Sequence, residues 1–415
     1  MNNPAKPSPM GGIRILDLTV MTAGPVGTML LGDLGADIIK VEEPTHGDLA
    51  RDLGTQFVNG ESVQFLAQNR NKRSIRLNLK CEAGKEVFLR LAKNVDVIVE
   101  NFRPGTVDRL GIGYDAVKAI NPQIIYASVS AFGQTGPYSG WPANDPIVQA
   151  VSGLMDMTGE ADGRPTRVGA PLPDFGAAAM LAFGISAALL HRERHGVGQR
   201  LDTSLLGASL FSTIPRDGEA IRSGKPPARL GSGHPTMAPY RNYQGSDGRY
   251  FFAAAFTEKF WINLCKAISR PDLLEDARFA SNTARTTNRE ALDGILEGIF
   301  IQAPAAQWVQ LLSERDVPCA QVQDYHTALT SDPQVCHSGA VMHFHHPVAG
   351  DMTNLANPVN LHASPATVYR PPPILGQHTE EVLQEHGFNT DEISELLHTG
   401  IVQGSRIEVA KGANN

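Results

Sequence analysis

One carboxylate stands alone in an apolar stretch of this chain. Asp174 lies in residues 168–180, VGAPLPDFGAAAM, and the next charged residue after it is Arg192. The prolines, leucine and phenylalanine around it would leave an ionised carboxylate poorly hydrated, which would make it a more reactive nucleophile. The structural interpretation is that Asp174 is the N-cap of the following helix, accepting from amides two or three residues on. The two roles are compatible, so the sequence leaves both open.

A second group of side chains suits a nucleotide-like ligand. The segment ENFRPGTVDRLG, residues 100–111, starts at the end of a predicted strand, where open α/β sheets bind ligands. It offers the amide of Asn101, the ring of Phe102 for a purine, and the guanidinium groups of Arg103 and Arg109. A plain turn between a strand and a helix would explain the same residues.

Positive charge gathers in residues 69–80, NRNKRSIRLNLK. Lys72, Arg73 and Lys80 are candidates for holding an anionic cofactor through charge-assisted hydrogen bonds. The alternation in SIRLNL predicts a strand with Arg76 and Asn78 on its outer face, and a solvated face would also explain the charges.

Other kinds of site fit the sequence poorly. The turn TAGPVG is not GxGxxG, and Pro25 removes an amide that a pyrophosphate would need, which argues against a nicotinamide cofactor. His191 and His195 lack the glutamate order of HExxH, and the HFHHP cluster at 343–347 suits a surface loop, so no metal is expected. The four cysteines have no CxxC spacing, which fits a reducing cytosol better than a disulfide framework.

The elements that must position these residues alternate along the chain. Apolar runs at 13–18, 37–44, 96–102 and 124–132 predict buried strands, with helical spacing between them, and a long helix follows Asp174 and ends at Gly196. This alternation predicts the α/β class: a Rossmann-like large domain with an open, mostly parallel sheet, plus a smaller α+β domain.

Length and composition agree with a soluble two-domain enzyme. The chain has 415 residues, 42% hydrophobic and 19% charged, and its net charge of −7 does not favour nucleic acid. We expect a large domain over 11–215, a linker and small domain over 216–350, and a return linker with C-terminal helices over 351–415. No signal peptide is evident, and the apolar run at 177–190 is shorter than a membrane span, so the expected location is the cytoplasm.

Taken together, the motifs resemble the family III CoA-transferases, also called the CaiB/BaiF family, which includes formyl-CoA:oxalate and carnitine CoA-transferases. The resemblance covers about residues 11–400. The matching pieces occur in the family's order: GGIRILDLTVMTAGP, LGADIIKVEEPTHGD, NRNKRSIRLNLK, VENFRPGTVDRLGIGY, ASVSAFGQTGPY, DPIVQAVSGLMDMTG, VGAPLPDFGAA, RLGSGHPTMAPY and PPPILGQHTEEVL.

This resemblance implies an acyl-CoA:carboxylate CoA-transferase with Asp174 as the catalytic aspartate. Acyl-CoA and a carboxylic acid would be the substrates, with no permanently bound cofactor and no metal, and the chain would form an interlocked homodimer. Lys72 and Arg73 match the family's NKRS and are expected to be structural. The positions that the resemblance assigns to CoA and the thioester are Thr22, Ala23, Leu77, Asn78, Lys80, Asn101, Phe102, Arg103, Arg109 and Asp145, with Gly231, Ser232 and Gly233 as a mobile loop over the site.

Two departures and two alternatives accompany the resemblance. Thr22 stands where oxalate-using relatives have Gln, which puts oxalate and formate in doubt, and Asp145 stands where a relative has Glu. The α-methylacyl-CoA racemases share the fold but need a His where this chain has Asn144, and Asn cannot take up a proton. A non-catalytic CoA-binding protein, with Asp174 only as a cap, is the other alternative.

Overall fold

The structure is a computed structural model that describes residues 8–405. Contacts divide the chain into two compact units. The first comprises the chain up to residue 152, residues 169–215, and the chain from residue 337. The second comprises residues 153–168 and 216–336.

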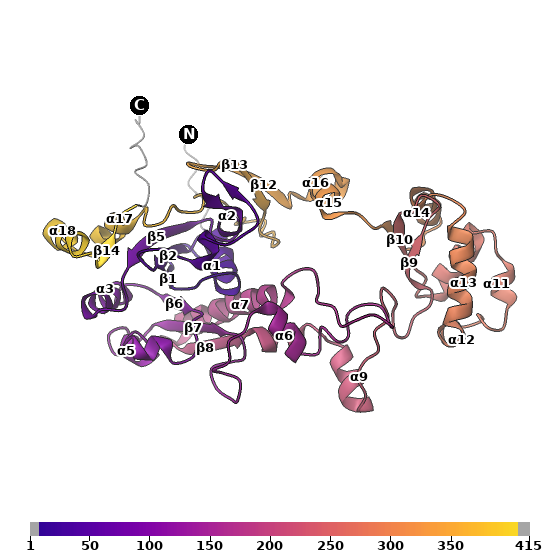
Figure 1. Cartoon of the computed structure of the whole chain (residues 1–415), viewed down its shortest axis with the longest axis horizontal. Coiled ribbons are helices and arrows are strands. Elements are labelled where there is room, and N and C mark those ends of the chain that lie inside the picture. Colours follow the sequence, from indigo (N-terminus) through magenta and orange to yellow (C-terminus); the bar gives the residue numbers. More distant parts are fainter. Residues whose placement is uncertain (1–7, 406–415) are drawn as a thin grey trace. The chain divides into compact units, whose positions relative to one another are not determined.

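The first unit is built on a seven-stranded sheet in the order β14-β5-β2-β1-β6-β7-β8 (Figure 1). Every neighbouring pair is parallel except β14 with β5. The strands are β1 (Arg14–Asp17), β2 (Asp37–Glu42), β5 (Lys72–Leu77), β6 (Val97–Glu100), β7 (Ile125–Ser130), β8 (Arg200–Ser204) and β14 (Val402–Gln403). The mostly parallel α/β sheet expected from the alternating pattern is therefore confirmed.

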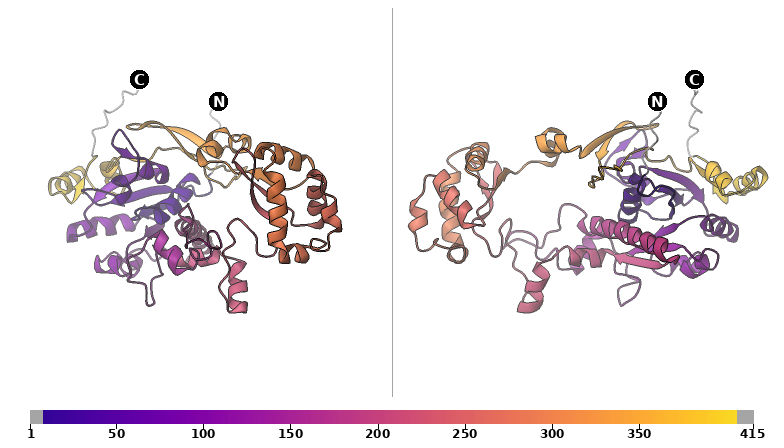
Figure 2. Two further views of the ribbon diagram at one scale, coloured as in Figure 1. Left: turned by 45° about the vertical axis from the view of Figure 1, so that its right-hand side comes forward. Right: turned by 180° about the vertical axis from the view of Figure 1, so that it is seen from behind.

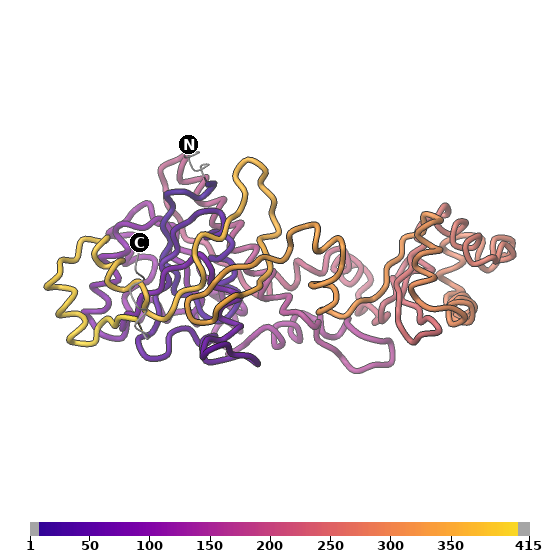
Figure 3. The backbone as a smooth tube through the Cα atoms, turned by 90° about the horizontal axis from the view of Figure 1, so that it is seen from above, coloured from indigo at the N-terminus to yellow at the C-terminus, as the bar shows by residue number. Residues whose placement is uncertain are grey.

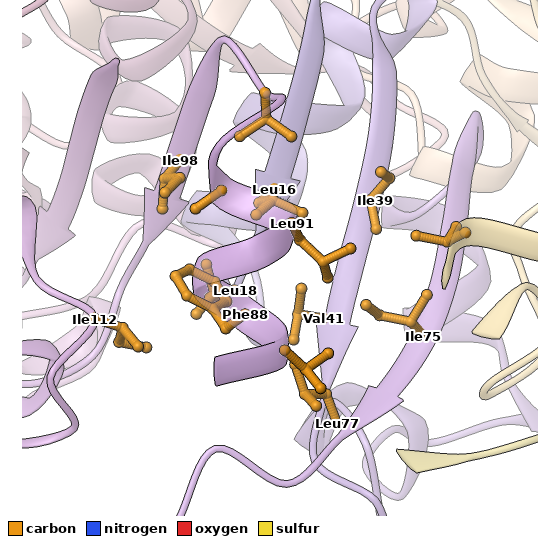
Figure 4. Close-up of a cluster of buried hydrophobic side chains, with 14 of the residues drawn as sticks. Leu16, Leu18, Ile39, Val41, Ile75, Leu77, Phe88, Leu91, Ile98 and Ile112 are labelled. Atoms are coloured by element: carbon orange, nitrogen blue, oxygen red, sulfur yellow. The ribbon is translucent and has the colours of Figure 1, made fainter. Parts of the chain in front are cut away.

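Side chains from both faces of this sheet are buried, because successive residues of a strand point to opposite sides. Leu16 and Ile39 pack with Phe88 and Leu91 of α3 (Glu82–Ala92) on one face (Figure 4). Ile15 on the other face belongs to a cluster with residues of α1 (Ala23–Asp33) and α7 (Leu172–His195). The remaining elements of this unit are η1 (Leu49–Arg51), β3 (Phe57–Val58), β4 (Glu61–Ser62), α2 (Val63–Gln68), α4 (Thr106–Arg109), α5 (Tyr114–Lys118), α6 (Asp145–Val151), α8 (Leu205–Phe211), β12 (Val341–His346), β13 (Gly350–Leu355), α17 (Thr379–Glu385) and α18 (Thr390–His398).

The topological switch point of the sheet lies between β1 and β6. The chain runs from β1 through β2 to β5 on one side, and from β6 through β7 to β8 on the other. Loops after the carboxyl ends of β1 and β6 therefore part from each other, which creates the crevice where open α/β sheets bind ligands.

Helix α7 begins earlier than predicted but ends where predicted. It begins at Leu172, so Asp174 lies in its first turn rather than in a loop, and Gly196 ends it as expected, in the left-handed conformation with φ 70°. Its 24 residues exceed the apolar run at 177–190, so by length and composition alone this helix could cross a membrane. One face nevertheless packs in the unit's core through residues such as Leu181 and Ile185, and a single helix of this kind is weak evidence for a span.

The C-terminal segment packs against the N-terminal half of the first unit, where the yellow tube lies beside the indigo and purple one in Figure 3. Ile374 and Leu375 are buried there, the amide of Gly376 donates to Ser74 Oγ at 2.8 Å, and Val402 pairs with Leu77. The last strand of the sheet is thus supplied by the end of the chain.

The second unit contains an antiparallel sheet, β11-β10-β9, packed against helices (Figure 2). Trp261, Phe251 and Phe300 lie in its core. Its elements are α9 (Arg216–Ser223), β9 (Tyr240–Gln244), β10 (Tyr250–Ala254), α10 (Glu258–Ala267), α11 (Asp272–Glu275), α12 (Asn282–Thr287), α13 (Arg289–Phe300), α14 (Ala305–Glu314), β11 (Cys319–Gln321) and α15 (Tyr325–Ser331), while α16 (Pro333–Ser338) spans the boundary.

The unit boundaries differ from the expected domain limits in two places. Residues 153–168 join the second unit, where Gly159 accepts the amide of Gly231 at 2.9 Å. Residues 337–350 join the first unit, since β12 forms a hairpin with β13.

Candidate active site

A cavity of about 240 Å³ lies at the crevice between β1 and β6. It brings together five of the residues singled out from the sequence, whose side chains come from four separate segments of the chain: Thr22, Ala23, Asn101, Asp145 and Asp174. The remainder of its lining is Val20, Met21, Val129, Ser130, Ala131, Ala143, Asn144 and Leu205.

The carboxylate of Asp174 faces this cavity without acting as a helix cap. Pro171 occupies the N-cap position of α7, and no side-chain cap bond forms there. The backbone amide of Asp174 donates to Asp145 Oδ2 at 3.2 Å, while its carboxylate forms no hydrogen bond among residues 8–405. The N-cap interpretation is therefore wrong: the N-cap lies three residues earlier, at Pro171, and the carboxylate of Asp174 stays available.

The surroundings of Asp174 favour its protonated form. Burial, with the nearby charge of Asp145 adding to it, raises the pKa of Asp174 to about 7. Asp145 is only 5% exposed and is held by Gln149 Nε2 at 2.6 Å from its Oδ1. The site thus contains a fixed carboxylate beside one whose charge changes near neutral pH.

A short turn after β1 forms the opposite wall of the cavity. Asn101 holds this turn with both ends of its amide: Val20 N donates to Oδ1 at 2.9 Å, and Nδ2 donates to Val20 O at 2.8 Å. Thr22 and Ala23 follow directly, at the start of α1. The polar atoms of Asn101, expected to meet CoA, are therefore engaged by the turn.

A second cavity of about 250 Å³ lies next to the first, and Val20 lines both. It contains four more of the expected residues, Leu77, Asn78, Lys80 and Phe102. Leu18, Val41, Leu79 and Leu110 give it a largely apolar wall, which suits a planar ring better than a chain of phosphates.

Several predicted residues lie outside both cavities. Arg103 and Arg109 are exposed, and Arg109 donates to Thr106 Oγ1 at 3.0 Å, beside the second cavity. Gly231, Ser232 and Gly233 belong to the second unit, where Ser232 Oγ donates to Asn242 Oδ1 at 2.6 Å.

The basic stretch divides into buried and exposed members. Lys72 is buried in an ion pair with Asp17 at 2.9 Å, and Arg73 pairs with Asp37 at 2.6 Å. Neither can hold an anionic cofactor, whereas Lys80 is exposed. Arg76 is half-buried under the C-terminal segment, donating to Gly404 O at 3.1 Å, so the predicted open outer face is wrong.

Sequence reasoning missed other residues of the site. Glu42, Glu43 and Asp48 line the second cavity, and Ser130 and Asn144 line the first. Their position in the sequence could have indicated them. Each of these polar residues lies at or after the carboxyl end of a predicted strand, or just before the helix that begins at Asp145.

Comparison with known proteins places this arrangement in a family. The family model described as CoA-transferase family III matches residues 10–379. Succinyl-CoA:glutarate CoA-transferase of Mus musculus is 38% identical over 397 residues, covering 95% of this chain and 90% of the relative. Acetyl-CoA:oxalate CoA-transferase of Acetobacter aceti is 43% identical over 323 residues, covering 77% of this chain and 82% of the relative.

A solved structure agrees with these relatives. The crystal structure of a CAIB/BAIF family protein from Brucella suis has a TM-score of 0.81 at 33% identity, covering 91% of this chain and 99% of that one. The family match spans both cavities and Asp174. The chain therefore belongs to CoA-transferase family III and is a CoA-transferase.

Proposed function

We propose that this enzyme moves CoA from an acyl-CoA thioester to a carboxylic acid through covalent intermediates on Asp174. The observation that carries the proposal is the Asp174 carboxylate, which has no hydrogen bond within the described part of the chain and faces a cavity that adjoins a second, apolar cavity at Val20. The first cavity would hold the acyl group and thioester, and the second the nucleotide end of CoA.

The first half of the reaction transfers CoA to the enzyme. An oxygen of ionised Asp174 attacks the thioester carbonyl carbon, and the C–S bond breaks to leave CoA thiolate and a mixed anhydride. The thiolate then attacks the aspartyl carbonyl carbon of the anhydride. The C–O bond breaks, the donor acid leaves as a carboxylate, and an aspartyl-CoA thioester remains.

The second half repeats these steps with the acceptor. The acceptor carboxylate attacks the aspartyl carbonyl and expels the thiolate, forming a new mixed anhydride. The thiolate attacks the acceptor's acyl carbon, which yields the new acyl-CoA and restores the Asp174 carboxylate. No metal or redox step is required by this balance, and backbone N–H groups are proposed to stabilise the oxyanions.

The remaining expected contacts are assigned by position. We propose that Phe102 and Leu77 contact the adenine ring, with Lys80 and Arg109 binding phosphates through charge-assisted bonds. Asn78 and Arg103 are assigned to the rim of this cavity, Thr22 and Ala23 to the thioester, and Asp145 to the backbone of the nucleophile.

The substrates proposed for the first assays come from the named relatives, which act on succinyl-CoA with glutarate or mesaconate and on acetyl-CoA with oxalate. The test incubates the protein with succinyl-CoA, acetyl-CoA or formyl-CoA, adds hydroxylamine, and maps the modified peptide by mass spectrometry. Hydroxamate at Asp174 supports the covalent route and names the donor. Absence of modification with every thioester, while CoA binds, would contradict it, and exchange of the substrate α-proton would then identify a racemase.

The pH dependence of transfer follows from the charge of Asp174. Because the attacking group is the carboxylate, the rate is expected to rise with pH and level off above the Asp174 pKa of about 7. Asp145→Asn keeps an acceptor for the Asp174 amide but removes the like charge, so the midpoint should move to lower pH by about 1 unit. Initial rates at constant ionic strength measure this; an unchanged midpoint would remove Asp145 as a cause.

We also propose that the enzyme is a homodimer, as the family resemblance implies, with the two chains interlocked. Apolar side chains run along the outer face of α7: Phe183 is 70% exposed and Phe175 49%, with Met180 and Leu190 on the same helix. Faces of this kind on soluble proteins are commonly covered by a partner.

Free cysteines are consistent with a cytoplasmic location.

The dimer proposal predicts a mass change. Phe183→Asp places a charge on the proposed interface, so light scattering after size exclusion is expected to shift from the dimer mass toward the monomer mass. Ile221→Asp is the matched control, because Ile221 is 83% exposed, more than Phe183, but lies on α9 in the second unit. A monomeric wild type, or a Phe183→Asp protein that stays dimeric, would contradict this assignment.

A further inference from the structure

The turn after β1 is held by side chains rather than by a β-ladder. Thr19 N donates to Asp17 Oδ1 at 2.9 Å, and Lys40 Nζ donates to Thr19 O at 2.6 Å. The next residue, Val20, has both its backbone groups on Asn101. The path of the turn therefore depends on side chains that come from three different strands or strand ends.

Met21 is the exceptional residue of this turn. Its φ is +69°, in the left-handed region that residues with a side chain rarely occupy. Its amide donates to Asp48 Oδ1 at 2.9 Å, and the same oxygen accepts the amide of Ala50 at 2.9 Å. The bond to Asp48 thus stabilises a backbone conformation that is strained for a residue with a side chain.

Asp48 is itself buried and held by an ion pair and by a hydrogen bond from its own amide. It is 0% exposed, and its Oδ2 lies 2.8 Å from Lys40 Nζ, also fully buried. Its amide donates to Glu42 Oε2 at 2.9 Å, and Glu42 is paired with Arg51 at 2.7 Å. Burial lowers the pKa of Lys40, but Asp48 and the other nearby carboxylates more than offset this and raise it, so Lys40 stays charged.

Asp48 and the Met21 that it holds lie on the walls of the two cavities proposed to bind the substrate. Met21 lines the cavity that contains Asp174, Asp48 lines the neighbouring cavity, and Val20 between them lines both. Resting on the proposed function, we infer that Asp48 is a positioning residue: by holding Met21 in the left-handed conformation, it sets the wall of residues 20–23 against which the acyl group must meet Asp174. It touches no reacting atom.

Two substitutions at Asp48 separate this role from general stability. Asp48→Asn and Asp48→Leu both remove the charge that faces Lys40, but only Asn keeps an acceptor for the Met21 amide. We expect kcat for succinyl-CoA and glutarate to fall less than tenfold in Asp48→Asn and about 100-fold in Asp48→Leu, as a misplacement of about 1 Å produces. The Kd for CoA should differ less than threefold between them, because residues 41–44, 77–80 and 102–110, which both substitutions leave unchanged, supply most of the lining of the second cavity. Equal kcat values in two folded variants would overturn the inference.

A second pair of variants leaves the buried charges untouched. Met21→Ile and Met21→Leu introduce isomeric side chains, and only Ile is branched at Cβ, which makes a positive φ much less accessible. We expect kcat of Met21→Ile to be at least about tenfold below that of Met21→Leu, with similar melting temperatures. Equal rates would overturn the inference, and this pair decides if the Asp48 variants do not fold.

The wild-type protein in the same assays keeps the two hypotheses apart. Transfer by the wild type together with equal rates in each pair rejects the role of Asp48 alone. No hydroxamate on Asp174 of the wild type with any of the thioesters rejects the proposed function, and the inference with it.

Discussion

Asp174→Asn is expected to lower the rate of CoA transfer by at least about 10⁴-fold, the scale of losses seen when a covalent nucleophile is removed. An amide oxygen cannot form the mixed anhydride, and no other carboxylate on the first cavity is free, because Asp145 is bound to Gln149 and to the Asp174 amide. The measurement is the rate of acyl-CoA exchange followed by chromatography, over a range of donor concentrations.

The control measurements separate chemistry from folding. The Kd of CoA should change less than about threefold, and Asp162→Asn, an exposed carboxylate of the second unit, should leave transfer unchanged. Retention of more than a tenth of wild-type transfer in Asp174→Asn would remove Asp174 as the nucleophile.

The same substitution should affect stability in a pH-dependent way. The pKa of Asp174 is raised by folding from 3.8 to about 7, so the stability that its protonated form contributes is lost as pH rises through that interval. Asp174→Asn should therefore melt at a higher temperature than the wild type at pH 8, and the difference should vanish below about pH 4.

Lys72→Met is expected to destabilise the first unit by about 3–5 kcal/mol, because it leaves the buried carboxylate of Asp17 without its partner. Burial lowers the pKa of Lys72 to about 8 against the opposing charge of Asp17, while Lys72 and Lys40 keep the pKa of Asp17 far below its usual value despite burial. Urea unfolding at pH 7 measures the loss.

Lys80→Met is the matched control in the same basic stretch. Lys80 is exposed and lines the second cavity, so its substitution should change stability by less than about 0.5 kcal/mol. It should weaken CoA binding about tenfold, the effect of one charge-assisted hydrogen bond. A stable Lys72→Met protein, or a Lys80→Met protein with unchanged CoA affinity, would contradict the respective assignment.

Much of the fold was accessible to sequence reasoning because its strands are buried on both sides. Runs such as residues 13–18 and 96–102 are rich in branched apolar residues, which is typical of buried parallel strands, and segments with helical spacing separate them. The positions of Asp174, Thr22 and Asn101 at one crevice then follow from the direction of the strands.

The side-chain partners were not accessible in the same way. Nothing local indicates that Asn101 turns its amide to Val20, that Lys72 pairs with Asp17, or that Arg73 meets Glu381 more than three hundred residues away. Asp174 was misplaced relative to the helix start because Pro171 and Pro173 suggested a loop, whereas prolines are well tolerated in a first helical turn.

The origin of the last strand has a consequence for biosynthesis. Leu77 of β5 can pair with Val402 only after about 325 more residues have been synthesised, so this edge of the sheet remains unpaired while the ribosome makes the rest of the chain. At about 5–20 residues per second this interval is roughly 15–65 s. An open edge strand readily pairs with other chains. Newly made copies are therefore most vulnerable to aggregation during translation, and a message truncated just before codon 402 would yield a chain that never leaves that state.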